Sequence, residues 1–351
     1  MRRSYRSRYR SRVDRHRAPA VLQCARSCAG GSPWTRAALV AAAALGLAAC
    51  SGGGHPAGGQ APTSVSPLTG QAVAGGLPDR PVLVVKVDNS AAARPQVGLS
   101  AADLVVEELV EGGLTRLAVM YYAKLPDEVA PVRSVRTSDI GIVAPTGGAL
   151  IASGGARRVL RAVRDAGLVV VTEGAAGFSR DRTRPSPYNL VVAPAQTLTV
   201  VPDLGPPVHP YLPWASAGPA QVSGSPASAA SIRFSAAHTT GWDWTADGWH
   251  RRDELAPKGD EFTPDNVLVL RVTTRDAGYR DPAGNPVPET VLTGSGDALL
   301  LAGGHAVRAR WSKSDSSSPL ALTDTAGDEL QVPPGRTWIE LVPRSGDVTV
   351  S

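Results

Sequence analysis

Charged side chains gather beside the apolar segments in the first half of this 351-residue chain. Arg is suited to recognising carboxylate or phosphate, because its planar guanidinium group donates several hydrogen bonds. We therefore expect the arginines either to form an anion-binding cluster or to pair with the neighbouring Asp and Glu residues. Both alternatives stay open at this point. The candidate ligand-binding residues are Asp88, Asn89, Arg94, Glu107, Glu111, Arg116, Arg133, Arg136, Arg180 and Asn189.

The same region contains weaker signals for catalysis. Glu107 and Glu111 are a candidate pair for glycoside hydrolysis, which needs two carboxyl groups on either side of the bond. Ser153 precedes two glycines but lacks the G-x-S-x-G pattern of a nucleophile elbow. Asp88 and Asn89 could ligate a hard cation, yet two oxygen ligands are too few for a calcium site. No catalytic residue is assigned, and no metal or cofactor is expected.

Short apolar runs predict the strands that would position these side chains. A helix is expected over residues 156–166, because Gly167 follows it and glycine commonly ends helices. In open α/β sheets, ligands bind outside the carboxyl ends of the strands. The candidate site is expected there. The strands predicted for the first half are 81–87, 102–110, 117–122, 149–153 and 168–171.

The second half has the pattern of a β-rich domain. Residues 242–251 alternate around an Asp-Gly dipeptide, which favours a tight hairpin turn. Residues 267–272 and 337–342 are apolar runs typical of buried strands, and residues 298–311 predict a hairpin around two glycines. The fold class predicted from both halves is an α/β N-terminal domain followed by a mainly β C-terminal domain.

An apolar segment from Ala37 to Ala49 leads directly to Cys50. It is too short to span a bilayer, which takes about 20 apolar residues. Its Leu-Ala-Ala-Cys ending resembles a bacterial lipobox, so we expect a basic leader and signal peptide over residues 1–49 and a lipid on Cys50. The mature protein would then be held by its lipid on the outer face of the cell membrane.

Charge and cysteine content agree with an exported protein. Residues 1–50 contain ten of the 36 Arg and Lys residues but one of the 31 Asp and Glu residues. The rest of the chain therefore has four more acidic than basic residues, which argues against nucleic acid as a partner. All three cysteines lie within residues 1–50: Cys24 and Cys28 in the leader, and Cys50 as the lipid acceptor. The mature part is expected to have no internal disulfide and no thiolate metal site.

Composition also predicts the domain organisation. Two stretches are rich in Gly, Ala, Ser and Pro, and such stretches bury too little apolar surface to fold. The predicted divisions are the leader 1–49, lipidated Cys50 with a flexible linker to residue 66, an α/β domain at 67–214, a linker at 215–230 and a β-rich domain at 231–345.

A long ordered series of motifs resembles the YerB-like lipoprotein family, also called the DUF3048 family. The resemblance covers most of residues 67–345 and implies a two-domain, lipid-anchored protein of the cell envelope. It implies no reaction. The matching motifs begin at Val84-Val85-Lys86-Val87-Asp88-Asn89 and continue through Glu107-Glu108-Leu109-Val110-Glu111, Ala130-Pro131-Val132-Arg133-Ser134, Ser153-Gly154-Gly155, Phe178-Ser179-Arg180-Asp181, Pro187-Tyr188-Asn189-Leu190, Trp311-Ser312-Lys313 and Gly335-Arg336-Thr337-Trp338.

Two departures from the family pattern concern histidine. Many relatives have a histidine where this chain has Ala152 and Tyr188. His209 is the one histidine of residues 67–214, and it lies in a proline-rich segment. Histidine acid–base chemistry and a histidine metal site are therefore not expected here.

The function that follows is binding of an anionic cell-envelope component, such as a glycan, phosphate or carboxylate group, through the arginine-rich side of the first domain. One alternative is a hydrolase acting on an envelope glycan or phosphodiester with paired carboxylates. Another is a non-catalytic scaffold for a membrane protein partner. An enzyme is the less favoured reading, because each catalytic signal is weak by itself.

Overall fold

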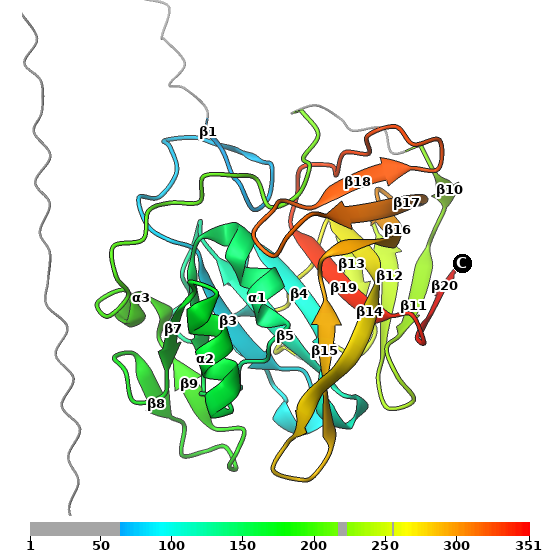
Figure 1. Cartoon of the computed structure of the whole chain (residues 1–351). Coiled ribbons are helices and arrows are strands. Elements are labelled where there is room, and N and C mark those ends of the chain that lie inside the picture. The colour runs from blue at the N-terminus through cyan, green and yellow to red at the C-terminus, as the bar shows by residue number, and fades with distance from the viewer. Residues whose placement is uncertain (1–63, 217–222, 255) are drawn as a thin grey trace, which may run out of the picture. The chain divides into compact units, whose positions relative to one another are not determined.

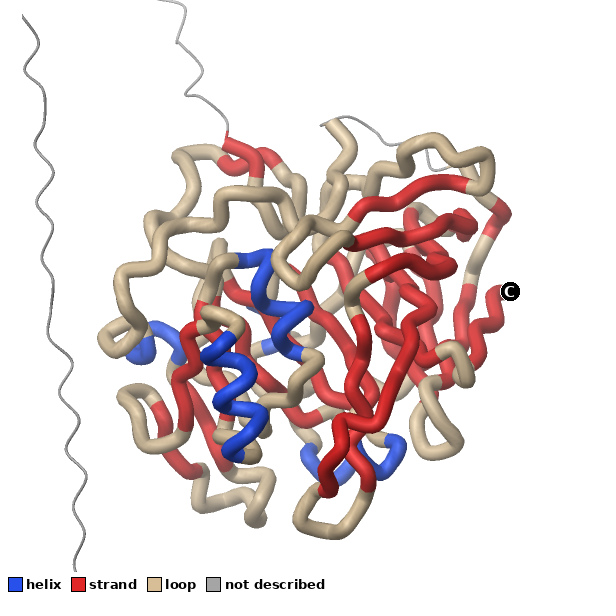
Figure 2. Tube along the Cα trace, in the orientation of Figure 1, coloured by secondary structure: helices blue, strands red, loops and turns tan. Residues whose placement is uncertain are grey.

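The structure is a computed structural model that describes residues 64–216, 223–254 and 256–351 (Figure 1). The predicted leader, Cys50 and nearly all of the first linker lie outside the described residues. Strands dominate the described part of the chain, and a few short helices accompany them (Figure 2). The structure thus confirms the expected fold class, an α/β first half followed by a mainly β second half.

The first half supplies five strands to a central sheet, and each begins and ends within a few residues of its predicted range. Their side chains are almost all buried, because both faces of the sheet are covered. The strands are β3 (Leu83–Asp88), β4 (Leu104–Leu109), β5 (Thr115–Tyr121), β6 (Ala149–Ala152) and β7 (Val169–Thr172).

The second half supplies the other strands of the same sheet. β14 continues well beyond the predicted residues 267–272, and its distal end pairs with β15 to form a two-stranded arm. These strands are β10 (Ser225–Pro226), β14 (Asn266–Arg280), β15 (Pro286–Val291), β16 (Gly294–Ala302), β17 (His305–Lys313), β18 (Ala321–Asp324) and β19 (Thr337–Pro343).

One parallel strand pair joins the two halves into a single sheet. The strand order is β10-β17-β16-β14-β19-β4-β5-β3-β6-β7, with β15 and β18 as branches. β19 lies between β14 and β4 and is parallel to both. In this register Glu340 of β19 lies beside Glu107 of β4. The sheet therefore brings carboxylates from both halves together.

A smaller sheet packs against one face of the central sheet through tryptophans. Trp242 of the small sheet meets Trp338 of β19 edge to face, with ring centroids 5.3 Å apart. Both side chains are buried, so they belong to the core rather than to an exposed binding platform. The small sheet consists of β11 (Ala229–Arg233), β12 (Thr239–Thr245), β13 (Gly248–Arg251) and β20 (Asp347–Val350).

The helices α1 (Asp139–Val143) and α2 (Arg157–Asp165) cover the opposite face of the central sheet. Helix α2 confirms the helix predicted over residues 156–166. No helix of the described ranges is long and apolar enough to cross a membrane. The small elements are β1 (Ser64–Val65), β2 (Ala72–Val73), β8 (Phe178–Arg180), β9 (Leu190–Val192), α3 (Pro194–Thr197) and four short 3-10 turns at 91–93, 99–101, 111–113 and 144–146.

Candidate functional site

Alternation along β4 determines where the carboxylates of the candidate site point. Successive side chains of a strand face opposite sides of its sheet. Glu107 therefore faces the small sheet, while Glu108 faces the helices. Glu111 follows the end of the strand and joins a third group of side chains. These three glutamates, which lie close together in the sequence, thus belong to three separate polar clusters.

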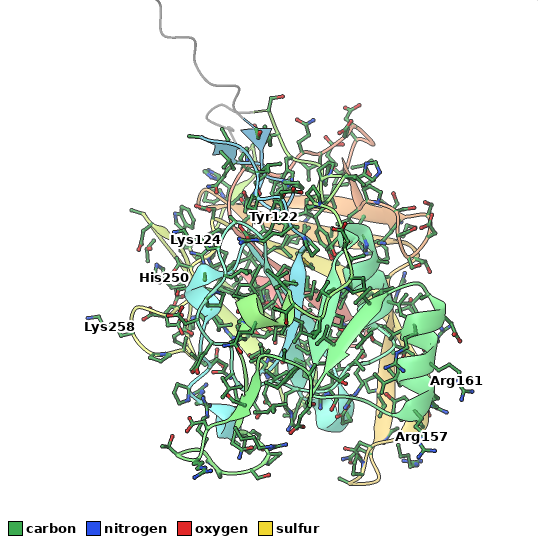
Figure 3. The ribbon with its side chains drawn as sticks, turned by 90° about the vertical axis from the view of Figure 1, so that its left-hand side faces the viewer. Tyr122, Lys124, Arg157, Arg161, His250 and Lys258 are labelled. Carbon is green, nitrogen blue, oxygen red and sulfur yellow. The ribbon has the colours of Figure 1, made fainter. Side chains whose placement is uncertain are left out.

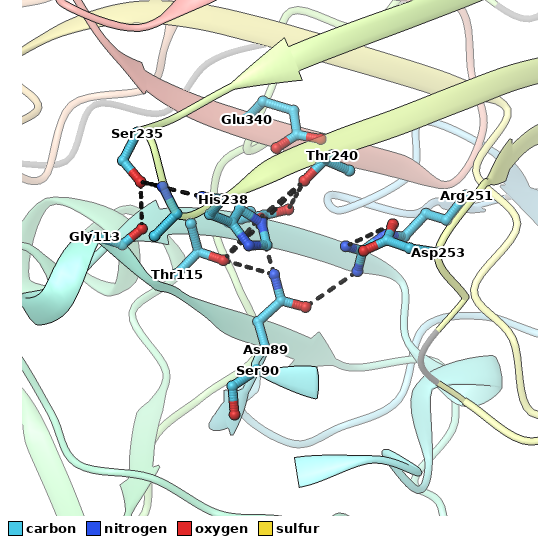
Figure 4. A network of polar contacts seen from close by, with 12 residues as sticks. Asn89, Ser90, Gly113, Thr115, Ser235, His238, Thr240, Arg251, Asp253 and Glu340 are labelled. Carbon is cyan, nitrogen blue, oxygen red and sulfur yellow. Dashed lines mark hydrogen bonds and ion pairs between the residues drawn. The ribbon is translucent and has the colours of Figure 1, made fainter. Parts of the chain in front are cut away.

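The first cluster, which we call the Glu107 network, connects the two halves of the molecule (Figure 4). His238 Nε2 lies 2.6 Å from Glu107 Oε1. Asn89 donates to Glu107 Oε1 at 2.8 Å, and Arg251 donates to the Asn89 side chain at 3.1 Å. Thr115 and Thr240 complete the hydrogen bonds to the carboxylate. A glutamate with no exposed surface is thereby fully solvated by protein groups.

The two glutamates of this network differ in protonation. Burial opposes ionisation of Glu107, but the charge and hydrogen bond of His238, with Arg251 and Thr115, lower its pKa to about 2. Burial and the negative charge of Glu107 raise the pKa of Glu340 well above its usual range. Glu340 also accepts a hydrogen bond from Trp242 Nε1 at 2.8 Å. At neutral pH the pair thus consists of one ionised and one neutral carboxyl group.

The turn before β12 places His238 against the first half. Ser235 in this turn donates a hydrogen bond to the carbonyl oxygen of Gly113 at 2.6 Å. Gly113 has a φ of +72°, and a Cβ there would lie 2.9 Å from the Ser235 hydroxyl oxygen. Glycine is therefore needed for both the backbone conformation and the close approach. This contact fixes the turn that carries His238.

The second cluster is a buried ion triad under the helices. Lys86 Nζ lies 2.5 Å from Glu108 Oε1 and 2.7 Å from Asp139 Oδ1, and none of the three side chains is exposed. Burial disfavours the charged Lys86, but the two carboxylates outweigh it and raise its pKa. Burial raises the pKa of Glu108 despite the neighbouring Lys86. The triad ties β3, β4 and α1 together and has no exposed surface for a ligand.

The third cluster contains the arginines that the sequence singled out. Arg116 and Arg136 both donate to Glu111, the former at 2.8 Å. Burial opposes ionisation of Glu111, but the hydrogen bond from Arg136 and the charges of both arginines lower its pKa to about 2. Burial and repulsion by Arg136 lower the pKa of Arg116 to about 10. We call Arg116, Arg133 and Arg136, with Asp88 and Glu111, the arginine cluster.

Arg133 is the most exposed arginine of this cluster. Its Nε atom lies 2.9 Å from Asp88 Oδ2, and 24% of its side chain is exposed, against 7% for Arg116 and 8% for Arg136. Its guanidinium group also lies over the Tyr188 ring, 5.6 Å from the centroid. Three guanidinium groups here face two carboxylates, so positive charge is in excess. The donors of Arg133 are the ones a ligand could reach.

Two hydroxyl groups lie beside the arginine cluster at the carboxyl end of β6. Ser134 and Ser153 are 3.1 Å apart through their Oγ atoms, and both side chains are partly exposed. Arg116 donates to the Ser134 carbonyl oxygen at 3.0 Å. Helix α2 begins shortly afterwards, and its N-cap residue, Ala156, makes no side-chain cap. Hydroxyl donors and the positive end of a helix thus adjoin the arginines.

The arm of the second half reaches the same region. Arg158 of α2 stacks over the Tyr279 ring at 4.2 Å and donates to the Ala277 carbonyl oxygen at 2.5 Å. The pKa of Tyr279 is raised by burial, with Arg136 and Glu111 among the charges that act on it. Tyr279 therefore joins the surroundings of the arginine cluster from the second half.

The structure separates the remaining predicted residues from this cluster. Arg94 is partly exposed and lies 3.6 Å from Asp253. Arg180 donates to Asn189 Oδ1 at 2.7 Å and contacts Glu173 at 2.5 Å. Asn89 and Glu107 belong to the Glu107 network, so Glu107 and Glu111 do not share one set of partners. Among residues 64–216, 223–254 and 256–351, no group of three or more His, Cys, Asp or Glu is arranged to hold a metal ion.

Sequence reasoning missed several members of these clusters. The lack of histidines in the motifs of the first half gives no sign of His238, which comes from the second half. Lys86 offered a usable signal, because a charged residue inside an apolar strand needs a buried partner. The other missed members are Arg251, Tyr279 and Glu340.

Sequence comparison identifies relatives of this chain. A curated protein of Bacillus subtilis (strain 168), named "Putative lipoprotein YerB", is 44% identical over 71 residues. That match covers 20% of this chain and 22% of the relative. The crystal structure of YerB protein from Bacillus subtilis superposes with a TM-score of 0.68 at 20% identity, over 82% of this chain and 99% of the crystallised one. At that identity the likeness concerns the fold.

Two family models match consecutive parts of the chain. The model described as "Protein of unknown function (DUF3048) N-terminal domain" matches residues 68–206, and the corresponding C-terminal domain model matches residues 230–339. Together these matches cover most of the described fold, including β3–β9 in the first and β12–β18 in the second. The family resemblance of the sequence motifs is therefore confirmed, and the chain belongs to the DUF3048 family.

Proposed function

We propose that this protein binds an anionic component of the cell envelope at the arginine cluster. The observation that carries the proposal is the excess of guanidinium groups beside the partly exposed hydroxyls of Ser134 and Ser153. Arg116 and Arg136 are engaged by Glu111 and supply positive potential, while Arg133, Ser134 and Ser153 supply reachable donors. Guanidinium and hydroxyl donors in this combination suit a phosphate or carboxylate group.

We further propose that a lipid on Cys50 holds the protein on the outer face of the cell membrane. The Leu-Ala-Ala-Cys sequence and the lipoprotein name of the Bacillus relative support this location. Replacing Cys50 with Ala removes the acceptor, so the variant should remain unlipidated and unprocessed. Membrane fractionation with metabolic fatty-acid labelling tests it, and a Cys50→Ala chain that still incorporates label would contradict the anchor. Cys24→Ala is the matched control.

A thermal-shift screen of the full-length chain in neutral detergent tests ligand binding. Phosphate, citrate and anionic glycan fragments are compared with neutral sugars. A ligand at one hundred times its dissociation constant stabilises the native state by about 2.7 kcal/mol. We expect stabilisation by phosphate-bearing or carboxylate-bearing compounds and none by neutral sugars. Equal shifts with neutral sugars, or no shift with any anion, would contradict the proposal.

A further inference from the structure

Helix α2 presents a row of arginines to solvent. Arg157, Arg161 and Arg164 are exposed, whereas Val159 and Val163 are buried against the sheet. Spacings of four and three residues place the arginines on one face of the helix. Figure 3 shows Arg157 and Arg161 pointing away from the body of the protein. We call these three arginines the α2 stripe.

The arginines of the α2 stripe are unpaired within the part of the chain that the structure describes. None of its side chains makes an ion pair or a hydrogen bond there, and Asp165 is the single acidic residue of the helix. Like charges four residues apart on a helix repel each other, so an anionic partner would relieve the repulsion within this row. Three exposed arginines elsewhere do have internal partners: Arg252 pairs with Asp243 at 2.8 Å, Arg275 with Glu289 at 2.7 Å and Arg310 with Asp297 at 3.0 Å.

The α2 stripe begins close to the arginine cluster, because Arg157 follows Ser153 by four residues. Arg158, next to Arg157, stacks on Tyr279 of the second half. Arg157 and Arg164 are separated by seven residues, or about 10 Å along the helix axis. That length exceeds a single phosphate group. Basic groups therefore extend from the cluster along one outer side of the first half.

We propose that the α2 stripe extends the anion site, so that the ligand is a linear polymer with repeated phosphate groups. The inference rests on the proposed function, because the cluster holds one anionic group and the stripe holds those that follow. It assigns a role to an otherwise unneutralised helix face. A row of charges along one helix axis matches a chain of anions better than a single small ion.

The experiment compares orthophosphate with long-chain inorganic polyphosphate on the full-length chain in neutral detergent. The test variant is Arg157→Ala/Arg161→Ala/Arg164→Ala, and the matched control Arg252→Ala/Arg275→Ala/Arg310→Ala removes equal charge from paired positions. We expect polyphosphate affinity to fall about tenfold in the test variant at low salt, with orthophosphate affinity unchanged. The slope of log K against log salt should fall by about 2, as three fewer contacts imply.

Each outcome separates this inference from the proposed function. If the protein binds orthophosphate as tightly as polyphosphate, the ligand is not a polymer, and the proposed anion site still stands. Failure of both anions to bind overturns both proposals. If the test and control variants lose polyphosphate affinity equally, the effect comes from net charge, and the proposed role of the α2 stripe is wrong. A third arm uses phosphatidylglycerol vesicles with Cys50→Ala chains, and a stripe-dependent loss seen with vesicles but not with polyphosphate identifies a bilayer surface instead.

Discussion

Glu107 and Glu340 lie side by side on neighbouring parallel strands, one from each half of the chain. Both are fully buried, yet Glu107 is held ionised by His238 and Glu340 is held neutral by burial and by the charge of Glu107. The central sheet therefore carries an asymmetric carboxyl pair at the junction of its two halves. This pair makes the contact between the halves sensitive to changes in charge.

Replacing Glu340 with Gln tests the neutral state of that carboxyl group. A group with a raised native pKa stabilises the fold below its unfolded pKa, and that stability is lost as pH rises towards the native value. We expect wild-type stability to decline above about pH 4.5 by up to ~1.4 kcal/mol per pH unit from this group. Glu340→Gln should remove this decline while Trp242 keeps an acceptor. Urea unfolding between pH 5 and 8 measures it, and an unchanged slope would contradict the assignment.

Removing His238 should weaken the junction of the two halves. His238→Ala leaves the buried Glu107 carboxylate without its nearest counter-group, and breaking a buried pair costs about 3–5 kcal/mol. The matched control is His250→Ala, because His250 pairs with the exposed Asp247 at 3.2 Å and such pairs contribute about 0–1 kcal/mol. Chemical denaturation measures the unfolding free energies of the two variants. Equal losses in the two variants would show that the Glu107 network does not stabilise the junction.

The buried triad predicts a non-additive mutation series. Lys86→Met alone leaves Glu108 and Asp139 uncompensated in the core and should destabilise by about 3–5 kcal/mol. Neutralising all three, as Lys86→Met/Glu108→Gln/Asp139→Asn, should recover at least half of that loss because no buried charge remains. Unfolding free energies at pH 7 measure both chains. If the triple variant loses as much as the three single changes together, the charges do not act as one unit.

Glu111 predicts a loss of stability in acid. Its native pKa of about 2 lies below the unfolded value of 4.5, so its contribution is present above about pH 4.5 and disappears as pH falls towards 2. Glu111→Gln should therefore destabilise at pH 7, by about 2 kcal/mol after screening of this partly exposed pair. The difference from wild type should shrink by pH 3. A difference that stays constant from pH 7 to pH 3 would contradict the ion pairs with Arg116 and Arg136.

Local patterns in the sequence were sufficient for the elements but not for their assembly. The apolar runs at 81–87 and 337–342 predicted β3 and β19 because a strand buried on both faces has few polar residues. The parallel pairing of β19 with β4 joins Glu340 to Glu107, more than 200 residues apart. No local pattern encodes such a contact. His238 lies in a short turn whose partner likewise comes from distant sequence.

The sequence predicted many of the residues that form the polar clusters, but it did not predict which of them lie together. Grouping the candidate residues at one edge of the sheet agrees with the contact between Arg133 and Asp88. It did not separate Arg94 and Arg180, which pair with Asp253 and Glu173 elsewhere. Long arginine side chains reach partners that spacing along the chain does not specify. The arginine cluster is therefore smaller than the set of arginines that the sequence suggested.

The most direct test of anion binding is a calorimetric titration of the full-length chain with the best anion from the thermal-shift screen. Arg133→Gln removes the reachable guanidinium group and Ser153→Ala one hydroxyl, while Arg180→Gln is a control at a more exposed arginine outside the cluster. We predict that the first two weaken binding at least about tenfold, equivalent to 1.4 kcal/mol, and that the control changes little. Undiminished affinity in Arg133→Gln, with the protein still folded, would contradict the account.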